Sequence, residues 1–114
     1  MNKIVENKSF EFGVRIVKLY KYLCESQKEY TLSKQLLRAG TSIGANIAEA
    51  EQAQSRADFV SKLSIALKET VETDYWLRLM RETGYLTDSK FLSIHDNCIE
   101  LKKMLISIIK KTKQ

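Results

Sequence analysis

The chain has 114 residues, of which 44% are hydrophobic and 29% charged, with four glycines and no proline; this composition is typical of one helical domain over residues 1–114. Its formal net charge of +5 allows binding to nucleic-acid phosphates, although the same charge can serve solubility alone. One histidine and two distant cysteines argue against a zinc site, and the lack of a long apolar run or a leader predicts a cytoplasmic protein with no membrane contact and no cofactor.

The first helix is expected from about Ser9 to Gln27, with Ser9 as its N-cap. Seven side chains fill one broad apolar arc of this helix: Phe12, Ile16, Val17, Leu19, Tyr20, Leu23 and Cys24. The arc is wider than one core seam requires, so we expect burial on two sides, by the bundle and by a partner.

The second helix is expected from about Leu32 to Gln54. Its core stripe has helical spacing: Leu32, Leu36, Ala39, Ile43, Ile47 and Ala50. Gly40 and Gly44 interrupt it, and two interior glycines cost roughly 1 kcal/mol each relative to alanine. We expect the close approach of a neighbouring helix backbone to offset that cost.

A polar row follows one side of the second helix at steps of four, four and three: Arg38, Ser42, Asn46 and Glu49. Such a row can bind a ligand or catalyse a reaction, or it can be a half-buried network that fixes helix register. No nucleophile–base pair accompanies it. We therefore favour a structural network against the third helix, with Glu72 as a further member.

The third helix is expected from about Arg56 to Thr83, and Ser55 with Asp58 has the spacing of a capping box. Its core stripe comprises Phe59, Leu63, Ala66, Thr70, Leu77 and Met80. Trp76 falls outside this stripe. It can stack on a base or anchor a protein contact, and we favour packing or an oligomer interface.

The fourth helix is expected from about Ser89 to Lys111, capped by Thr87 or Asp88. One face carries its core residues: Phe91, Ile94, Cys98, Leu101, Leu105, Ile108 and Ile109. His95 lies at the edge of that face, where a satisfied border residue is a better interpretation than a metal ligand.

Short connections make consecutive helices neighbours, which predicts an antiparallel up-down-up-down four-helix bundle. Cys24 and Cys98 should then lie at similar heights and be buried as thiols. The two chain ends should meet at one pole and gather five lysines there: Lys3, Lys8, Lys110, Lys111 and Lys113. Arg15, Lys18 and Lys21 continue this basic surface along the first helix. These eight side chains are the candidate nucleic-acid contacts, expected to bind phosphates without reading bases.

Three segments, LSKQLLRAGTSIGANIAEA, DFVSKLSIALKET and ETDYWLRLM, resemble the four-helix-bundle family encoded in intervening sequences of bacterial 23S ribosomal RNA genes. The accessory variability determinant of diversity-generating retroelements is related to that family. The resemblance implies a ring-shaped homopentamer around a central channel. For the retroelement branch it also implies binding to nucleic acid and to a reverse transcriptase.

Two functions are therefore compatible with the sequence. The first is a non-catalytic, oligomeric adaptor that binds RNA or DNA, and the second is an oligomeric scaffold without nucleic-acid binding. An enzyme is the weakest interpretation, because one histidine and two cysteines on apolar faces do not supply an acid–base constellation.

Overall fold

The computed structural model describes residues 3–114, and within this range the regular secondary structure consists of four α-helices and no strand. The helices are α1 (Lys3–Glu25), α2 (Leu32–Ala50), α3 (Arg56–Glu82) and α4 (Asp88–Lys113). The predicted all-α class is confirmed. Ser55 caps α3 by accepting from the Asp58 backbone N–H at 3.0 Å, and Thr87 caps α4 by accepting from the Lys90 backbone N–H at 3.2 Å, as predicted.

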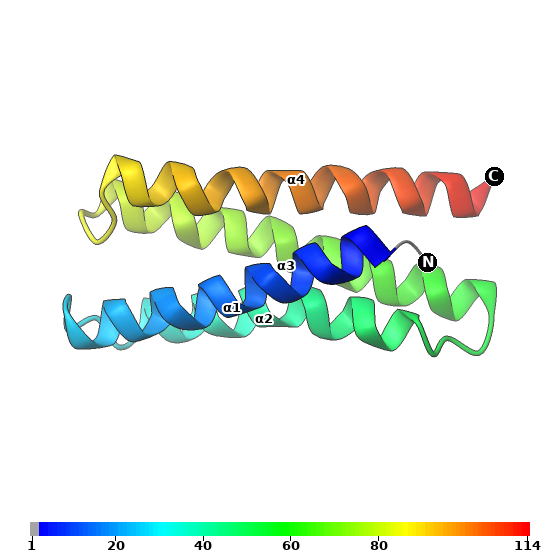
Figure 1. Ribbon diagram of the computed structural model, residues 1–114, viewed down its shortest axis with the longest axis horizontal. Coiled ribbons are helices and arrows are strands. Elements are labelled where there is room, and N and C mark those ends of the chain that lie inside the picture. Colours follow the sequence, from blue (N-terminus) through cyan, green and yellow to red (C-terminus); the bar gives the residue numbers. More distant parts are fainter. Residues whose placement is uncertain (1–2) are drawn as a thin grey trace.

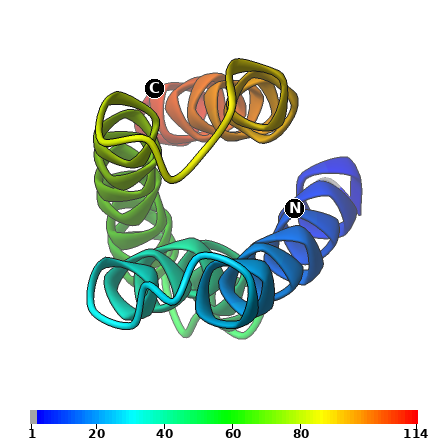
Figure 2. The same ribbon diagram turned by 90° about the vertical axis from the view of Figure 1, so that its left-hand side faces the viewer.

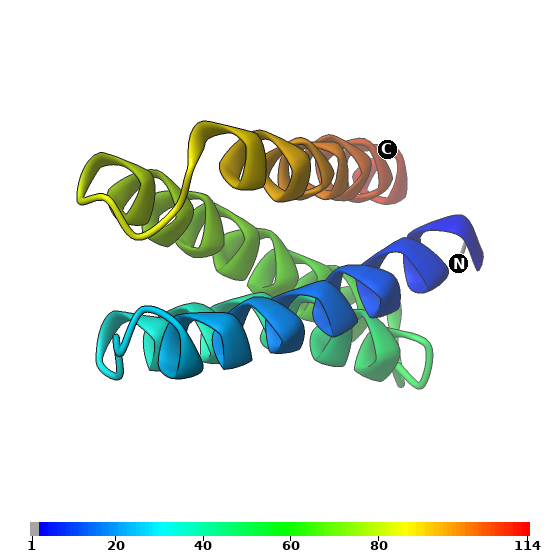
Figure 3. The ribbon, with the colours of Figure 1, turned by 60° about the vertical axis from the view of Figure 1, so that its left-hand side comes forward.

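The four helices pack side by side along the long axis of the molecule (Figure 1). The α1–α2 and α3–α4 connections lie at one end, and the α2–α3 connection, the start of α1 and the end of α4 lie at the other. A view along the helices shows α2 between α1 and α3, and α4 beside α3 (Figure 2). Toward its N-terminal end α1 diverges from α2 and approaches α4 (Figure 3). Among the helix pairs that are in contact, α1 and α4 pack least closely.

The core is built from buried apolar side chains of all four helices. They include Phe12, Ile16, Leu36, Ile43, Leu63, Leu77, Leu101 and Leu105. The predicted stripes of α2, α3 and α4 supply most of these positions. Val17, placed by prediction in the same arc as Phe12, is instead 38% exposed and belongs to a second apolar face of α1.

The start of α1 differs from the prediction. Ser9 is not an N-cap: it lies buried inside the helix, and its hydroxyl donates to the Glu6 backbone oxygen at 3.0 Å. Val5 is fully buried and extends the Phe12–Ile16 stripe backward at helical spacing. Burial of Val5 and of the Ser9 backbone therefore favours an earlier helix start.

The two helical glycines allow α1 to approach α2. A Cβ on Gly44 would lie 3.2 Å from the backbone oxygen of Ser9, so the predicted close approach to a helix backbone is confirmed there. A Cβ on Gly40 would lie 2.7 to 2.9 Å from three side-chain atoms of Ile16. At Gly40 the close neighbour is thus a side chain.

The two cysteines do not lie at similar heights. Cys24 is one residue from the end of α1, whereas Cys98 is ten residues after the start of α4. These helix ends lie at the same end of the molecule (Figure 1), so a rise of about 1.5 Å per residue places the thiols at different levels. The prediction was wrong because α1 begins six residues before Ser9 and ends at Glu25. Cys98 is buried as expected, but Cys24 is only half-buried.

The connection into α2 contains a cap that the sequence pattern did not predict. Lys28 has a positive φ of 54°, and the Glu29 side chain that follows is buried. Its carboxylate accepts hydrogen bonds from the backbone N–H groups of residues 31, 32 and 33 at 3.2, 2.9 and 2.7 Å. Glu29 therefore provides acceptors for the backbone N–H groups at the start of α2, where the Thr31 side chain makes no capping bond.

Candidate nucleic-acid and assembly surfaces

Four of the eight candidate cations are exposed at one end of the molecule. Lys3 lies where α1 starts, and Lys110, Lys111 and Lys113 lie on the last turn of α4 (Figure 1). Within the described residues, none of these four lysines forms an ion pair closer than 4.0 Å. The end of α4 therefore carries uncompensated positive charge.

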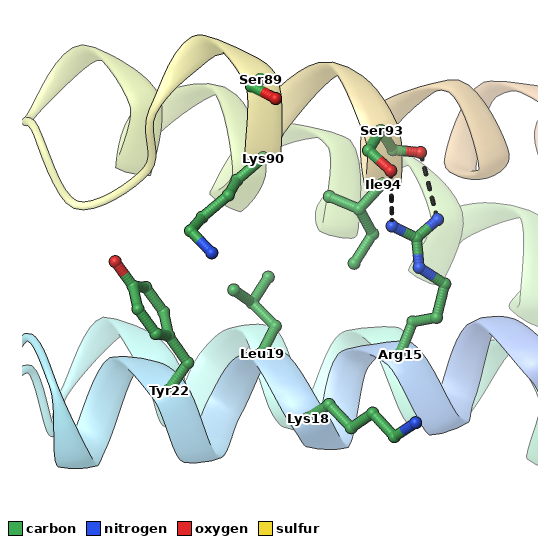
Figure 4. A pocket seen from close by; sticks show the side chains of 8 residues that line it. All are labelled: Arg15, Lys18, Leu19, Tyr22, Ser89, Lys90, Ser93 and Ile94. Atoms are coloured by element: carbon green, nitrogen blue, oxygen red, sulfur yellow. Dashed lines mark hydrogen bonds between the residues drawn. The ribbon is translucent and has the colours of Figure 1, made fainter.

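Lys8 and Arg15 lie instead between α1 and α4. The Lys8 ammonium is 3.2 Å from the Glu100 carboxylate. The Arg15 guanidinium donates to the backbone oxygen of Ser93 at 3.1 Å and to its hydroxyl at 2.8 Å (Figure 4). The two pairs are seven residues apart on both helices, so they fix the register of α1 against α4. Lys8 is thus charge-compensated and lies beside the middle of α4, away from Lys110 and its neighbours.

Lys18 and Lys21 are exposed along α1, where they border an apolar groove between α1 and α2. The groove has a volume of about 590 Å³. Its lining includes Phe10, Val14 and Val17 from α1 and Gly44, Ala45 and Ala48 from α2. Phe10 is 73% exposed, an unusual position for a large aromatic side chain.

Of the seven side chains in the predicted apolar arc of α1, only Val17 lines this groove, which belongs to a second apolar face of the helix. Phe10, Val14, Val17 and Lys21 recur at intervals of four, three and four, and the first three are exposed. Phe10 was not among the predicted site residues, although this spacing was a signal for a second apolar face. The small residues of α2 leave the facing wall shallow and accessible.

The predicted polar row links α2 to α3 through two of its four members. The Arg38 guanidinium binds Glu69 at 3.0 Å and also binds Glu72 on α3. Glu49 binds Lys62 of α3 at 2.9 Å. Ser42 and Asn46 bond within α2 instead: the Ser42 hydroxyl donates to the Arg38 backbone oxygen at 2.5 Å, and the Asn46 amide donates to the Ser42 backbone oxygen at 2.8 Å.

Trp76 belongs to the same network. Its indole Nε1–H donates to the Glu72 carboxylate at 3.0 Å, and its ring meets the Tyr75 ring edge-on at a centroid distance of 5.1 Å. The indole hydrogen bond and the Arg38 guanidinium together outweigh desolvation and lower the pKa of the Glu72 carboxyl. Trp76 is half-buried against the core, which supports the packing interpretation.

His95 is a satisfied border residue, as predicted. Its Nε2 lies 2.6 Å from the Asp74 carboxylate, and its ring stacks on Phe91 at 4.5 Å. Across residues 3–114, no group of three or more histidine, cysteine or acidic side chains is placed to hold a metal ion. In the same part of the chain, no helix combines the length and apolarity needed to cross a membrane.

Comparison with known proteins identifies the family. The sequence profile of the family described as 23S rRNA-intervening sequence protein matches residues 1–107. A crystal structure from Bacteroides thetaiotaomicron VPI-5482, of a protein with unknown function in the S23 ribosomal protein family, has a TM-score of 0.92 and 62% sequence identity, over 93% of this chain and 98% of that one. No curated protein matches the chain significantly. The protein described here therefore belongs to the 23S rRNA-intervening sequence protein family.

Proposed function

We propose that this protein is a non-catalytic, oligomeric adaptor that binds RNA or DNA through phosphate contacts. In this proposal the four helices form an antiparallel up-down-up-down bundle, and copies of the bundle assemble into a ring of five. The observation that carries the proposal is the uncompensated charge of Lys110, Lys111 and Lys113 at the end of α4. Membership in a family described by ribosomal RNA intervening sequences agrees with it.

The positive charge at the end of α4 is better suited to binding the phosphate backbone of a nucleic acid than to recognising its bases. Three lysines on one helical turn are flexible point charges without the fork geometry that reads base edges. Each phosphate that they neutralise releases counterions, which makes the affinity depend steeply on salt. A ring would repeat the patch on every copy, so individually weak contacts would act together.

The α1–α2 groove supports the assembly part of the proposal. Phe10 exposes most of its ring, and Val14 and Val17 extend the same surface along α1. Burying one such aromatic side chain contributes about 1.5–3 kcal/mol. A second copy of the chain that covers this groove would remove Phe10, which has the highest exposed fraction of the exposed aromatic side chains in residues 3–114, from water.

A scaffold without nucleic-acid binding is the second candidate, and the same groove favours it. The two functions differ in the salt-dependent affinity for nucleic acid. The test is a fluorescence anisotropy titration of labelled single-stranded RNA and duplex DNA, from low to physiological salt. We expect saturable binding at low salt, with an affinity that falls linearly on a log–log plot.

Charge reversal connects this binding to the end of α4. The double variant Lys110→Glu/Lys111→Glu should bind more weakly, and its log–log slope should decrease by about 0.7 for each phosphate of single-stranded RNA that the variant no longer neutralises. Lys34→Glu/Lys68→Glu is the matched control, since it changes the net charge equally on exposed positions of α2 and α3. Lack of binding by the wild type at low salt would leave the scaffold as the better explanation.

A further inference from the structure

A cavity of about 420 Å³ lies between α1 and α4, near the end of the molecule opposite Lys110 and Lys113. All of its lining side chains come from these two helices (Figure 4). It exists because α1 and α4 pack loosely, held by Arg15 on one side of the opening. Its volume is in the range of small-molecule sites, about 300–1,000 Å³.

The charged side chains that line the cavity are all positive. Arg15, Lys18 and Lys90 are among the described residues that line it, and none of those residues is acidic. Arg15 and Lys90 approach from opposite helices at the two sides of the space, whereas Lys18 extends along α1 (Figure 4). Such an arrangement favours an anion, because two cations from separate helices can contact one bound group from both sides.

The Arg15 guanidinium is held in place by neutral acceptors, which do not offset its positive charge. Ser93 accepts two of its hydrogen bonds, through a backbone oxygen and a hydroxyl, and both acceptors are neutral. Guanidinium has five N–H donors in a planar fork, so donors remain for an oxyanion. A fixed arginine loses less conformational freedom on binding than a mobile one.

Lys90 is the exposed cation on the facing helix. Its ammonium lies 4.5 Å from the centre of the Tyr22 ring, and no carboxylate within the described residues pairs with it. A cation on an aromatic face at an exposed site gains only about 0.5–1 kcal/mol. A phosphate can therefore draw Lys90 away from Tyr22, and this would also uncover the face of the ring.

The remaining walls suit the organic part of a nucleotide. Leu19 and Ile94 point into the space between the helices, Leu19 on the side of Tyr22 and Ile94 on the side of Arg15 (Figure 4). The Tyr22 hydroxyl accepts from the Gln27 amide at 2.9 Å, which restrains the ring. Aromatic and apolar side chains of this kind stack against a base without demanding a particular sequence.

We propose that this cavity binds a nucleotide, with Arg15 and Lys90 on its phosphate and with Tyr22, Leu19 and Ile94 against its base. The ligand is either a free nucleotide or one nucleotide of a single strand, since both present the same phosphate and base. The second source rests on the proposed function. The site is separate from the lysines at the end of α4, so the two contacts can be tested independently.

The test uses uridine 5′-monophosphate, uridine and a labelled strand of ten uridines as probes. In amide NMR spectra of the full chain, uridine 5′-monophosphate should cause saturable shifts around residues 15–22 and 89–94, whereas uridine should not. Lys90→Gln removes a charge that, within residues 3–114, contacts the Tyr22 ring and no carboxylate, and it should weaken binding about tenfold. Lys68→Gln, an exposed lysine on α3, is the matched control and should leave binding unchanged.

The outcomes separate the ligand sources and the two proposals. Shifts with the mononucleotide assign a free nucleotide site. Binding of the strand alone, weakened by Lys90→Gln, assigns a contact to single-stranded nucleic acid. Strand binding that depends on Lys110 and Lys111 but not on Lys90, without shifts by the mononucleotide, overturns this inference and leaves the proposed function intact. Mononucleotide binding without any affinity for the strand overturns the proposed function and leaves this inference intact.

Discussion

Arg38 on α2 binds the Glu72 carboxylate on α3, and the same carboxylate accepts the indole N–H of Trp76 one turn further along. Truncation of Glu72 to alanine should lower the free energy of unfolding by about 1–2 kcal/mol, because the half-buried indole loses its acceptor. Urea denaturation measures this. A double-mutant cycle with Arg38→Ala should give a coupling of about 0.2–1 kcal/mol, as expected for a partly exposed ion pair. Strict additivity would contradict the network.

Gly40 should tolerate no side chain. A Cβ there would lie within 2.7 to 2.9 Å of the buried Ile16 side chain, whose β-branched rotamer is stiff. Gly40→Ala should lower the free energy of unfolding by about 1–2 kcal/mol, since overpacking outweighs the gain in helix propensity. Gly13→Ala is the matched control in α1, where nothing lies within 4 Å of the new Cβ, and it should raise stability. Equal effects of the two substitutions would show that the packing at Gly40 is loose.

Glu29 should make stability depend on acid pH. Burial disfavours its charge, but the backbone N–H groups at the start of α2 outweigh burial and lower the pKa of its carboxyl below the ordinary 4.5. A lowered pKa in the folded state means that the stabilisation is present above pH 4.5 and is lost as pH falls through the folded pKa.

The variant Glu29→Gln isolates this contribution. At pH 7 the free energy of unfolding of this variant should be about 1 kcal/mol lower than that of the wild type, because an uncharged amide is a poorer cap for three N–H groups. The difference should shrink as the pH is lowered below 4.5. A difference that stays constant from pH 7 to pH 3 would mean that the charge of Glu29 does not matter.

The two thiols should react at different rates. Burial, together with the nearby Asp74 carboxylate, raises the pKa of the Cys98 thiol to about 12, and its Sγ is 3.5 Å from the Thr70 backbone oxygen. Cys24 is half-buried near the end of α1. Iodoacetamide at pH 8 should therefore label Cys24 in the native protein and both residues in urea. Native labelling of a Cys24→Ser variant at the wild-type rate would refute the assignment.

Local signals predicted much of the fold. The apolar stripes of α2, α3 and α4 repeat over many turns, and Ser55 and Thr87 are side chains whose capping chemistry acts within three residues. Ser9 was misassigned as an N-cap because a serine hydroxyl can also donate to a carbonyl inside a helix. The burial of Val5 favours the helix that starts earlier and places Ser9 inside it. The choice depended on tertiary packing.

The candidate surfaces were harder to predict for the same reason. Arg15 contacts Ser93 across 78 residues of sequence, and the cavity beside this pair depends on how far α1 and α4 diverge. No local pattern encodes that angle. The candidate cations could be found from the sequence, but helix register decides which of them meets a carboxylate: Lys8 pairs with Glu100, whereas Lys110 has no ion pair within residues 3–114.

Assembly and nucleic-acid binding are expected to occur together. Sedimentation velocity with labelled single-stranded RNA tests both in one measurement, with Phe10→Asp to disrupt the groove and Ile106→Asp as the control at another exposed apolar position. We expect the wild type and the control to sediment at about five times the 13.2 kDa chain mass and to carry RNA. Phe10→Asp should sediment as a smaller species and bind RNA weakly. A wild-type species of 13.2 kDa, with RNA sedimenting alone, would contradict both the assembly and the nucleic-acid binding.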